Sequence, residues 1–177
     1  MSGSGKTYWS GKFADAGYKR FGCDDLISDR LAVEEGAAPA DFPMHQWVGY
    51  PYQPEHAVRA HRYLETEVAV MQDILAELAT AREEENMVID TTGSVIYMPP
   101  EIQAELRRLT KVVYLDTTAA DHKRMLQGYL QKPVAVLWNG LFQPLPEEPI
   151  EQTFARCYPA LLNSREALYR QISELIL

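Results

Sequence analysis

The chain has 177 residues, of which 46% are hydrophobic and 24% charged, which suits one folded domain and excludes a disordered polypeptide. Asp and Glu outnumber Lys and Arg by 25 to 17, and the formal charge of −8 argues against general nucleic-acid binding. No apolar stretch reaches the ~20 residues of a membrane span, and the polar start does not resemble a signal peptide. Two cysteines without metal spacing suit a reducing compartment. We therefore expect one domain over residues 1–177 in a cytoplasmic monomer that binds neither nucleic acid nor membrane.

The chain begins Met-Ser-Gly-Ser-Gly-Lys-Thr, and its Gly5, Lys6 and Thr7 fit the end of the phosphate-binding loop pattern G-x-x-x-x-G-K-[ST]. The first glycine of that pattern falls one position before Met1, so a Ser-Gly linker is the alternative interpretation. Apolar spacing predicts a helix from Lys6 to Ala16 that a glycine ends, and this context favours the loop.

A loop of this kind binds phosphate through its backbone. Glycines let N–H groups turn toward phosphate oxygens, and the N-terminus of the following helix adds positive potential. Gly3, Ser4 and Gly5 would form this cradle. Lys6 would reach the β and γ phosphates, and the Thr7 hydroxyl would bind Mg²⁺. The sequence thus predicts ATP and Mg²⁺ as cofactors.

Strand and helix signals alternate after the loop. Short apolar runs predict strands, and longer stretches with helical spacing predict helices. This alternation implies parallel β-α-β units and a three-layer α/β fold. The expected strands are Tyr18–Cys23, Met87–Asp90, Lys111–Asp116 (the clearest buried strand) and Glu174–Leu177. The expected helices are Leu26–Glu34, Glu55–Glu85 (one long helix or two in sequence), Pro99–Leu109, Ala119–Leu130 and Ile150–Ile172. Pro159 would mark a break or a fresh start in the last of these. Residues 36–54 predict an aromatic insertion on the substrate side, and residues 131–149 an irregular, lid-like segment.

Three acids stand where predicted strands end. Asp24 and Asp25 follow the first strand, and Asp90 closes Met-Val-Ile-Asp in the manner of a Walker B strand. Ligands of open α/β sheets bind at that edge, where a carboxylate can accept a proton from a substrate hydroxyl or hold Mg²⁺. Helix capping is the alternative role for Asp24 and Asp25, and many ordinary strands end in Asp. The small residues Thr91–Gly93 would let a ligand approach the turn closely.

Three cations are candidates for binding anionic groups. Arg62 and Glu65 lie three residues apart on one helix face, where the carboxylate can direct the guanidinium at a ligand carboxylate. A surface ion pair is the alternative. Lys132 begins an irregular segment and is either a lid cation that closes over the γ phosphate or an ordinary exposed lysine. Arg165 lies on the C-terminal helix, where an exposed charge is the alternative.

Taken in order, these features resemble the shikimate kinase family of P-loop small-molecule kinases. The resemblance implies a three-layer P-loop fold and transfer of the γ-phosphoryl group of ATP to a hydroxyl of a small, carboxylate-bearing metabolite. It covers most of the chain: Ser-Gly-Ser-Gly-Lys-Thr, Asp24, Arg62-x-x-Glu65, the turn from Asp90 to Gly93, Val-Val-Tyr-Leu-Asp, Lys132-Pro133 and Arg165-Glu-Ala-Leu-Tyr.

The resemblance also implies roles for single residues. Lys6 and Thr7 would bind the phosphates and Mg²⁺, Asp24 would contact and deprotonate the substrate hydroxyl, and Gly93 would lie against the substrate. The remaining family positions fall on basic residues: Arg62 and Arg165 for the substrate carboxylate, Lys132 in place of a lid arginine, and Arg124 for the adenine.

Several positions depart from the family pattern. Its triple-glycine turn is Asp-Thr-Thr-Gly here, and Gly22 replaces the first acid of its Asp-x-Asp pair, so Asp25 or Asp90 would have to hold the metal. The family also has a strand before the loop and an adenine-contacting segment near its end, and neither is visible in this sequence. We expect the absent strand to leave a gap in the core, and we expect a fragment or a misassigned start.

Two other functions stay open. Gly22 and Lys132 are compatible with a kinase-like protein that binds nucleotide without transferring phosphate. A nucleotide or gluconate kinase would share the phosphate loop, and Asp-Asp-Leu after a strand is similar to gluconate kinases.

Overall fold

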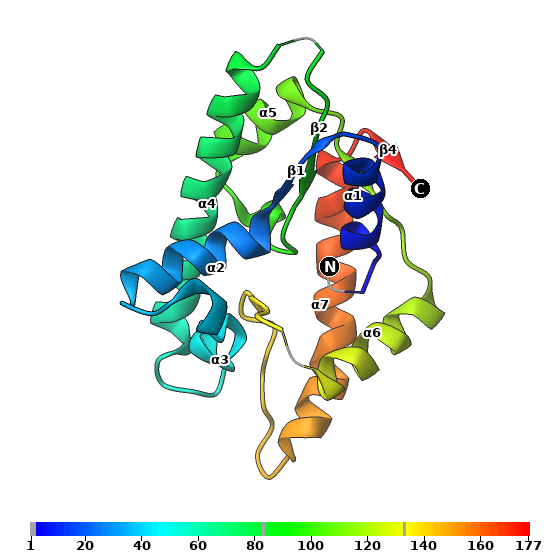
Figure 1. Cartoon of the computed structure of the whole chain (residues 1–177). Helices are drawn as coiled ribbons and strands as arrows, with labels where there is room; N and C mark the ends of the chain where they lie inside the picture. The colour runs from blue at the N-terminus through cyan, green and yellow to red at the C-terminus, as the bar shows by residue number, and fades with distance from the viewer. Residues whose placement is uncertain (1–2, 83, 133) are drawn as a thin grey trace.

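Helices and short strands alternate along the chain, as the hydrophobic pattern predicts (Figure 1). The computed structural model describes residues 3–82, 84–132 and 134–177. In chain order its elements are α1 (Lys6–Asp15), β1 (Lys19–Gly22), α2 (Cys23–Glu34), η1 (Pro39–Asp41), α3 (Met44–Val48), α4 (His56–Thr80), β2 (Met87–Asp90), η2 (Val95–Tyr97), α5 (Pro100–Leu109), β3 (Val113–Tyr114), α6 (Ala119–Gln131), α7 (Ile150–Ile172) and β4 (Leu175–Ile176).

The strands form two separate parallel pairs. β1 pairs with β2 from Lys19 opposite Met87 to Gly22 opposite Asp90, and the two-residue strands β3 and β4 pair with each other. Parallel strands need long crossovers, and the helices between the partners provide them. The mixed α/β class and the parallel pairing are confirmed. Within the described residues the two pairs do not join into one sheet.

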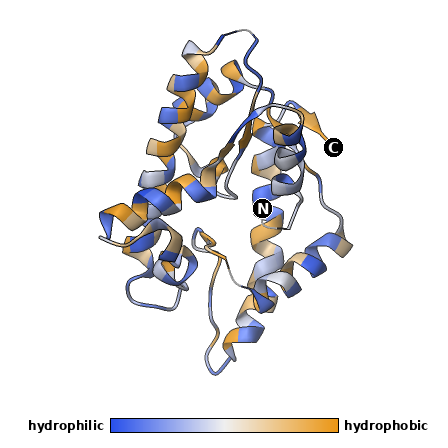
Figure 2. Ribbon diagram, viewed as in Figure 1, coloured by the Kyte–Doolittle hydropathy of each residue, from blue (hydrophilic) through white to orange (hydrophobic). Residues whose placement is uncertain are grey.

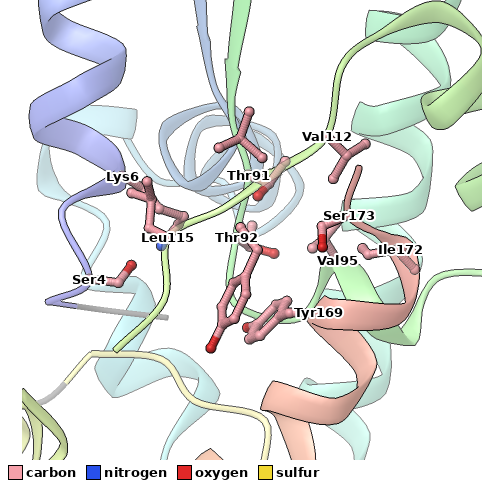
Figure 3. A pocket seen from close by; sticks show the side chains of 12 residues that line it. Ser4, Lys6, Thr91, Thr92, Val95, Val112, Leu115, Tyr169, Ile172 and Ser173 are labelled. Carbon is pink, nitrogen blue, oxygen red and sulfur yellow. The ribbon is translucent and has the colours of Figure 1, made fainter. Parts of the chain in front are cut away.

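A cavity of about 60 Å³ lies between the two strand pairs. Thr91 and Thr92 follow β2 on one side, residues 112–115 surround β3 on another, and Lys6 reaches it from the start of α1 (Figure 3). Tyr169 of α7 also lines it. Ser4 of the loop before α1 also lines it.

α2 begins earlier than the hydrophobic pattern predicts. Its first residue is Cys23 rather than Leu26, so Asp24 and Asp25 stand in its first turn. Acidic side chains are favourable there because they face the positive end of the helix dipole. The apolar pattern does not predict this first turn, because Asp24 and Asp25 in it are polar.

Three other elements also differ from the predictions. α4 ends at Thr80 instead of reaching Glu85. The stretch predicted as the clearest buried strand keeps only the two residues of β3, and Val113 is 43% exposed, so that prediction was wrong in extent and burial. α7 runs through Pro159 without a break. Proline disfavours a helix interior, but α7 stays continuous there, and buried side chains lie on both sides of Pro159.

The inner faces of the long helices build the core. Val70, Met71 and Ile74 repeat at helical spacing on α4 and are buried, and Figure 2 shows the matching bands of hydrophobic and hydrophilic residues along the helix. Two charged side chains interrupt these apolar faces. Glu67 of α4 is 1% exposed and Arg165 of α7 is 4% exposed. Because buried charges are costly without partners, both residues require an explanation.

Aromatic rings attach both irregular segments to α7. Trp138, in the segment predicted as lid-like, is buried and its ring centroid lies 5.6 Å from that of Phe154. Tyr50, in the predicted insertion, lies 5.7 Å from the same ring. Residues 134–149 are therefore anchored by buried aromatic side chains, and Pro133, predicted as part of the lid, lies outside the described residues. Over the ranges described, no helix combines the length and apolar character that crossing a membrane requires.

Candidate active site

A cavity of about 490 Å³ opens where the loop before α1, the start of α2, the turn after β2 and the middle of α7 meet. Its volume falls in the range of roughly 300–1,000 Å³ that small-molecule sites occupy. Residues predicted from sequence line it from four separate segments: Gly3, Gly5, Lys6, Thr7, Asp24, Gly93 and Arg165. The fold thus gathers at one place side chains that are spread over nearly the whole chain. Tyr8, Met44, Tyr63, Ser94 and residues 134–137 complete the wall.

The loop at the cavity has the backbone of a phosphate cradle. Gly3 and Gly5 have φ angles of +82° and +92°, a region that residues with a Cβ rarely adopt. A Cβ on Gly3 would also lie 3.2 Å from Cγ of Met125 in α6. Within the described residues no side chain caps the first turn of α1, so the positive end of this ten-residue helix faces the cavity. These features fit phosphate binding.

Asp24 and Lys6 both line the cavity and interact electrostatically. Asp24 is reachable by water, yet the surrounding protein desolvates its carboxylate and raises its pKa above the ordinary value. The nearby Lys6 ammonium opposes this rise. The Tyr63 hydroxyl donates a hydrogen bond to Oδ1 of Asp24 over 3.4 Å. A carboxylate with a raised pKa beside a lysine ammonium is chemically suited to take a proton from a hydroxyl.

Arg165 brings a second cation to the cavity wall. Its Nη2 donates to the Leu137 carbonyl oxygen at 2.5 Å, and its guanidinium carbon lies 5.4 Å from the centre of the Tyr97 ring. Among the described residues, no carboxylate lies within 4.0 Å of it and its buried Nε has no hydrogen-bond partner. Glu67 of α4 acts on this guanidinium electrostatically, but a buried guanidinium without a direct ion pair is still costly. The site therefore favours a ligand that carries a negative charge.

A second carboxylate stands behind the cavity. Glu67 of α4 accepts a short hydrogen bond from Oγ1 of Thr92, which lies 3.1 Å from Oγ of Ser94. Burial raises the pKa of Glu67 to about 7, and the hydroxyls of Thr92 and Ser94 only partly offset this effect. Oε2 of Glu67 has no hydrogen-bond partner among the described residues. Sequence reasoning missed Glu67, although an acid among the apolar positions of an inner helix face is a signal that could have found it.

A third polar cluster holds the loop helix to the strands. Oδ2 of Asp90 accepts hydrogen bonds from Nη2 of Arg20 at 2.8 Å and from Oγ of Ser10 at 3.1 Å. The three residues belong to β2, β1 and α1, so the cluster fixes α1 against the strand pair. Asp90 does not line the large cavity, because this ion pair turns its carboxylate to Arg20.

Five other predicted residues lie away from the large cavity. Arg62 donates to Glu34 on the outside of α2, and Arg124 pairs with Asp121 on exposed α6. Lys132 is exposed at the end of α6. Asp25 points toward Gly22, where an added Cβ would meet its Oδ2 at 2.8 Å. Ser4 lines only the smaller cavity. The roles predicted for these residues stay predictions, and the structure does not bring them together with Asp24.

Few of the side chains predicted to bind Mg²⁺ line the cavity. Thr7 lies in the first turn of α1 and lines the cavity, whereas Asp25 and Asp90 do not. Nowhere in the described ranges do three Asp, Glu, His or Cys side chains gather around a point. Mg²⁺ suits such a site because it keeps several waters and takes much of its coordination from substrate phosphates. Thr7 is the residue that would hold it.

No protein-family model matches the chain, and a search of curated proteins found no match. The function therefore has to be inferred from the site itself.

Proposed function

We propose that the chain is a P-loop small-molecule kinase, which transfers the γ-phosphoryl group of ATP to a hydroxyl of a small, carboxylate-bearing metabolite. One observation carries this proposal: the phosphate loop, Asp24 and Arg165 line the same cavity. A phosphate cradle, a base and an anion-binding cation are the three parts that such a transfer needs. Their convergence from distant segments is not required by packing.

Each residue has a distinct task in this reaction. The backbone of Gly3–Gly5 and the N-terminus of α1 bind the phosphates, and Lys6 neutralises charge that develops on the transferred group. Thr7 would hold Mg²⁺, which adds further neutralisation of phosphate charge when bound. Asp24 orients the acceptor hydroxyl and accepts its proton as the oxygen bonds to phosphorus.

Arg165 is the residue that would recognise the acceptor. Its guanidinium is buried, lines the cavity and makes no direct ion pair within the described residues, although Glu67 acts on it electrostatically. An acceptor carboxylate would give it a direct partner. Arg62, expected to share this task, is already paired with Glu34 and Glu35 outside the cavity. We therefore assign acceptor binding to Arg165 alone.

A second function is favoured by the position of Lys132. A kinase needs its charge-neutralising groups close to the transferred phosphate, and Lys132 is exposed and away from the cavity. The alternative is a protein that binds nucleotide and does not transfer phosphate. Such a protein would use the loop and Lys6 but would have no need for Asp24.

An ADP-release assay separates the two functions. The protein is incubated with Mg-ATP and, in turn, with shikimate, gluconate and nucleoside monophosphates, while calorimetry measures ATP binding. The kinase proposal predicts ADP release that one of these acceptors stimulates and that the Asp24→Asn variant loses. Tight ATP binding without stimulated release by any acceptor would favour the nucleotide-binding function instead.

A further inference from the structure

An exposed aromatic side chain lines the large cavity directly beside the loop. Tyr8 follows Thr7 in the first turn of α1, lines the cavity and is 63% exposed. Val134 lines the same cavity and is 38% exposed, whereas Arg165 in its wall is only 4% exposed. The cavity wall thus combines a buried cation with two apolar side chains that are open to solvent, one of them next to the loop.

Two neighbours on the same helix contact the Tyr8 ring without burying it. The Trp9 ring meets it edge to face, with the ring centroids 5.5 Å apart, and Nζ of Lys12 lies 5.7 Å from its centre, an exposed contact of a weak kind. A single exposed aromatic residue is ordinary on a protein surface. In the wall of a cavity that suits a small molecule, however, it offers a flat apolar surface to a ligand.

The ligand proposed for the loop carries a group that fits such a surface. Nucleic-acid bases stack on aromatic side chains, and every base has a π-face that can do so. Arg124, which the family resemblance assigns to the adenine, does not line the cavity. The acceptor is assigned to Asp24 and Arg165, so the part of the wall at Tyr8 is left for the part of the nucleotide beyond its phosphates.

We propose that the base of the nucleotide stacks on the Tyr8 ring while its phosphates lie on the loop. This inference rests on the nucleotide of the proposed function and adds a residue that recognises its base. The first turn of α1 would then contact both ends of the nucleotide, with its backbone N–H groups toward the phosphates and Tyr8 toward the base. The proposal applies equally to a protein that binds nucleotide without transferring phosphate.

Calorimetry with two ligands tests the stacking. Mg-ATP carries phosphates and a base, whereas inorganic tripolyphosphate with Mg²⁺ has the three phosphates alone. Both are titrated into the parent protein, Tyr8→Ala, Tyr8→Phe and Phe13→Ala. Tyr8→Phe keeps the ring. Phe13→Ala is the matched control, because Phe13 is an exposed aromatic residue of the same helix that does not line the cavity.

Stacking predicts a loss that is specific to the ligand with a base. Tyr8→Ala should weaken ATP binding by roughly fivefold to a hundredfold and leave the affinity for tripolyphosphate unchanged. The unchanged tripolyphosphate affinity also shows that the loop is intact in the variant. Tyr8→Phe and Phe13→Ala should bind both ligands as the parent does. A Tyr8→Ala variant that binds ATP with the parent affinity, or that weakens both ligands equally, would overturn the proposal.

NMR of the bound nucleotide provides a second test that needs no variant. Protons of a base that lies over an aromatic ring shift upfield, so the H2 and H8 resonances of ATP should shift upfield with the parent protein and with Tyr8→Phe. Unshifted resonances of ATP bound to the parent would overturn the stacking.

The two ligands also separate failure of the stacking from failure of the proposed function. A parent protein that binds both ligands with equal affinity would overturn the stacking alone. A parent protein that binds neither ligand would overturn the phosphate site, and with it the kinase function and the stacking.

Discussion

Replacing Glu67 with Gln should change how the free energy of unfolding depends on pH. Burial raises the pKa of Glu67 from 4.5 in the unfolded chain to about 7 in the folded protein. Between these values the folded protein holds a proton that the unfolded chain releases. The stabilising contribution is therefore complete below pH 4.5 and is lost as the pH rises through 7.

The size of this effect follows from the shift. A difference of about 2.5 pKa units at about 1.36 kcal/mol each gives roughly 3 kcal/mol over the whole range. Most of it, roughly 2 to 3 kcal/mol, falls between about pH 5 and about pH 8.5, where the measurement is practical. Because Gln carries no titratable proton, the difference between parent and variant isolates the contribution of Glu67, while the other titrating groups cancel.

Urea unfolding at several pH values provides the assay. Relative to the parent, Glu67→Gln should become more stable by roughly 2 to 3 kcal/mol as the pH rises across that range. Glu65→Gln should show a constant difference from the parent, because the Glu65 side chain is 66% exposed. If the difference in the free energy of unfolding between parent and Glu67→Gln is the same at every pH, the reasoning that Glu67 is buried with a raised pKa is refuted.

Three further substitutions test the placement of single residues. Arg165→Met should raise the acceptor KM by at least about tenfold through loss of a charged hydrogen bond, whereas Arg62→Ala should leave it unchanged; equal effects would contradict the assignment. Arg20→Met leaves the buried Asp90 without its cation and should lower the free energy of urea unfolding by about 3 kcal/mol, and a loss under about 1 kcal/mol would show that the pair is not structural. Trp138→Ala removes a buried ring and should cost about 3–5 kcal/mol in the same assay; an unchanged midpoint would mean that residues 134–149 are not anchored there.

Local patterns in the sequence were sufficient for most elements of the fold. β2 coincides with the predicted strand Met87–Asp90, and α7 has the predicted ends Ile150–Ile172, because these segments carry strong apolar patterns. The length of β3 was overestimated, because a run of apolar residues does not show which of them pair with a neighbouring strand. Pro159 was misread because its local effect on the helix is weaker than the packing around it.

Those parts of the candidate site could be predicted whose residues belong to a recognisable sequence motif. The loop from Gly3 to Thr7 and Asp24 fall into this class, and both line the cavity. Arg62 shows the limit of such reasoning, because its partner Glu34 comes from another helix and only the folded structure reveals the pair. Glu67 belongs to no recognisable motif, and only the fold shows that the hydroxyl groups of Thr92 and Ser94 lie against its carboxylate.

The most direct test of the kinase proposal compares ADP release by the parent protein, Lys6→Ala and Lys12→Ala, with Mg-ATP and the stimulating acceptor. Lys6 lines the cavity, whereas Lys12 lies on the same helix with its side chain 56% exposed and is the matched control. We predict that Lys6→Ala lowers turnover by about a hundredfold or more without unfolding the protein, and that Lys12→Ala keeps the parent rate. Unchanged turnover in Lys6→Ala would contradict the account.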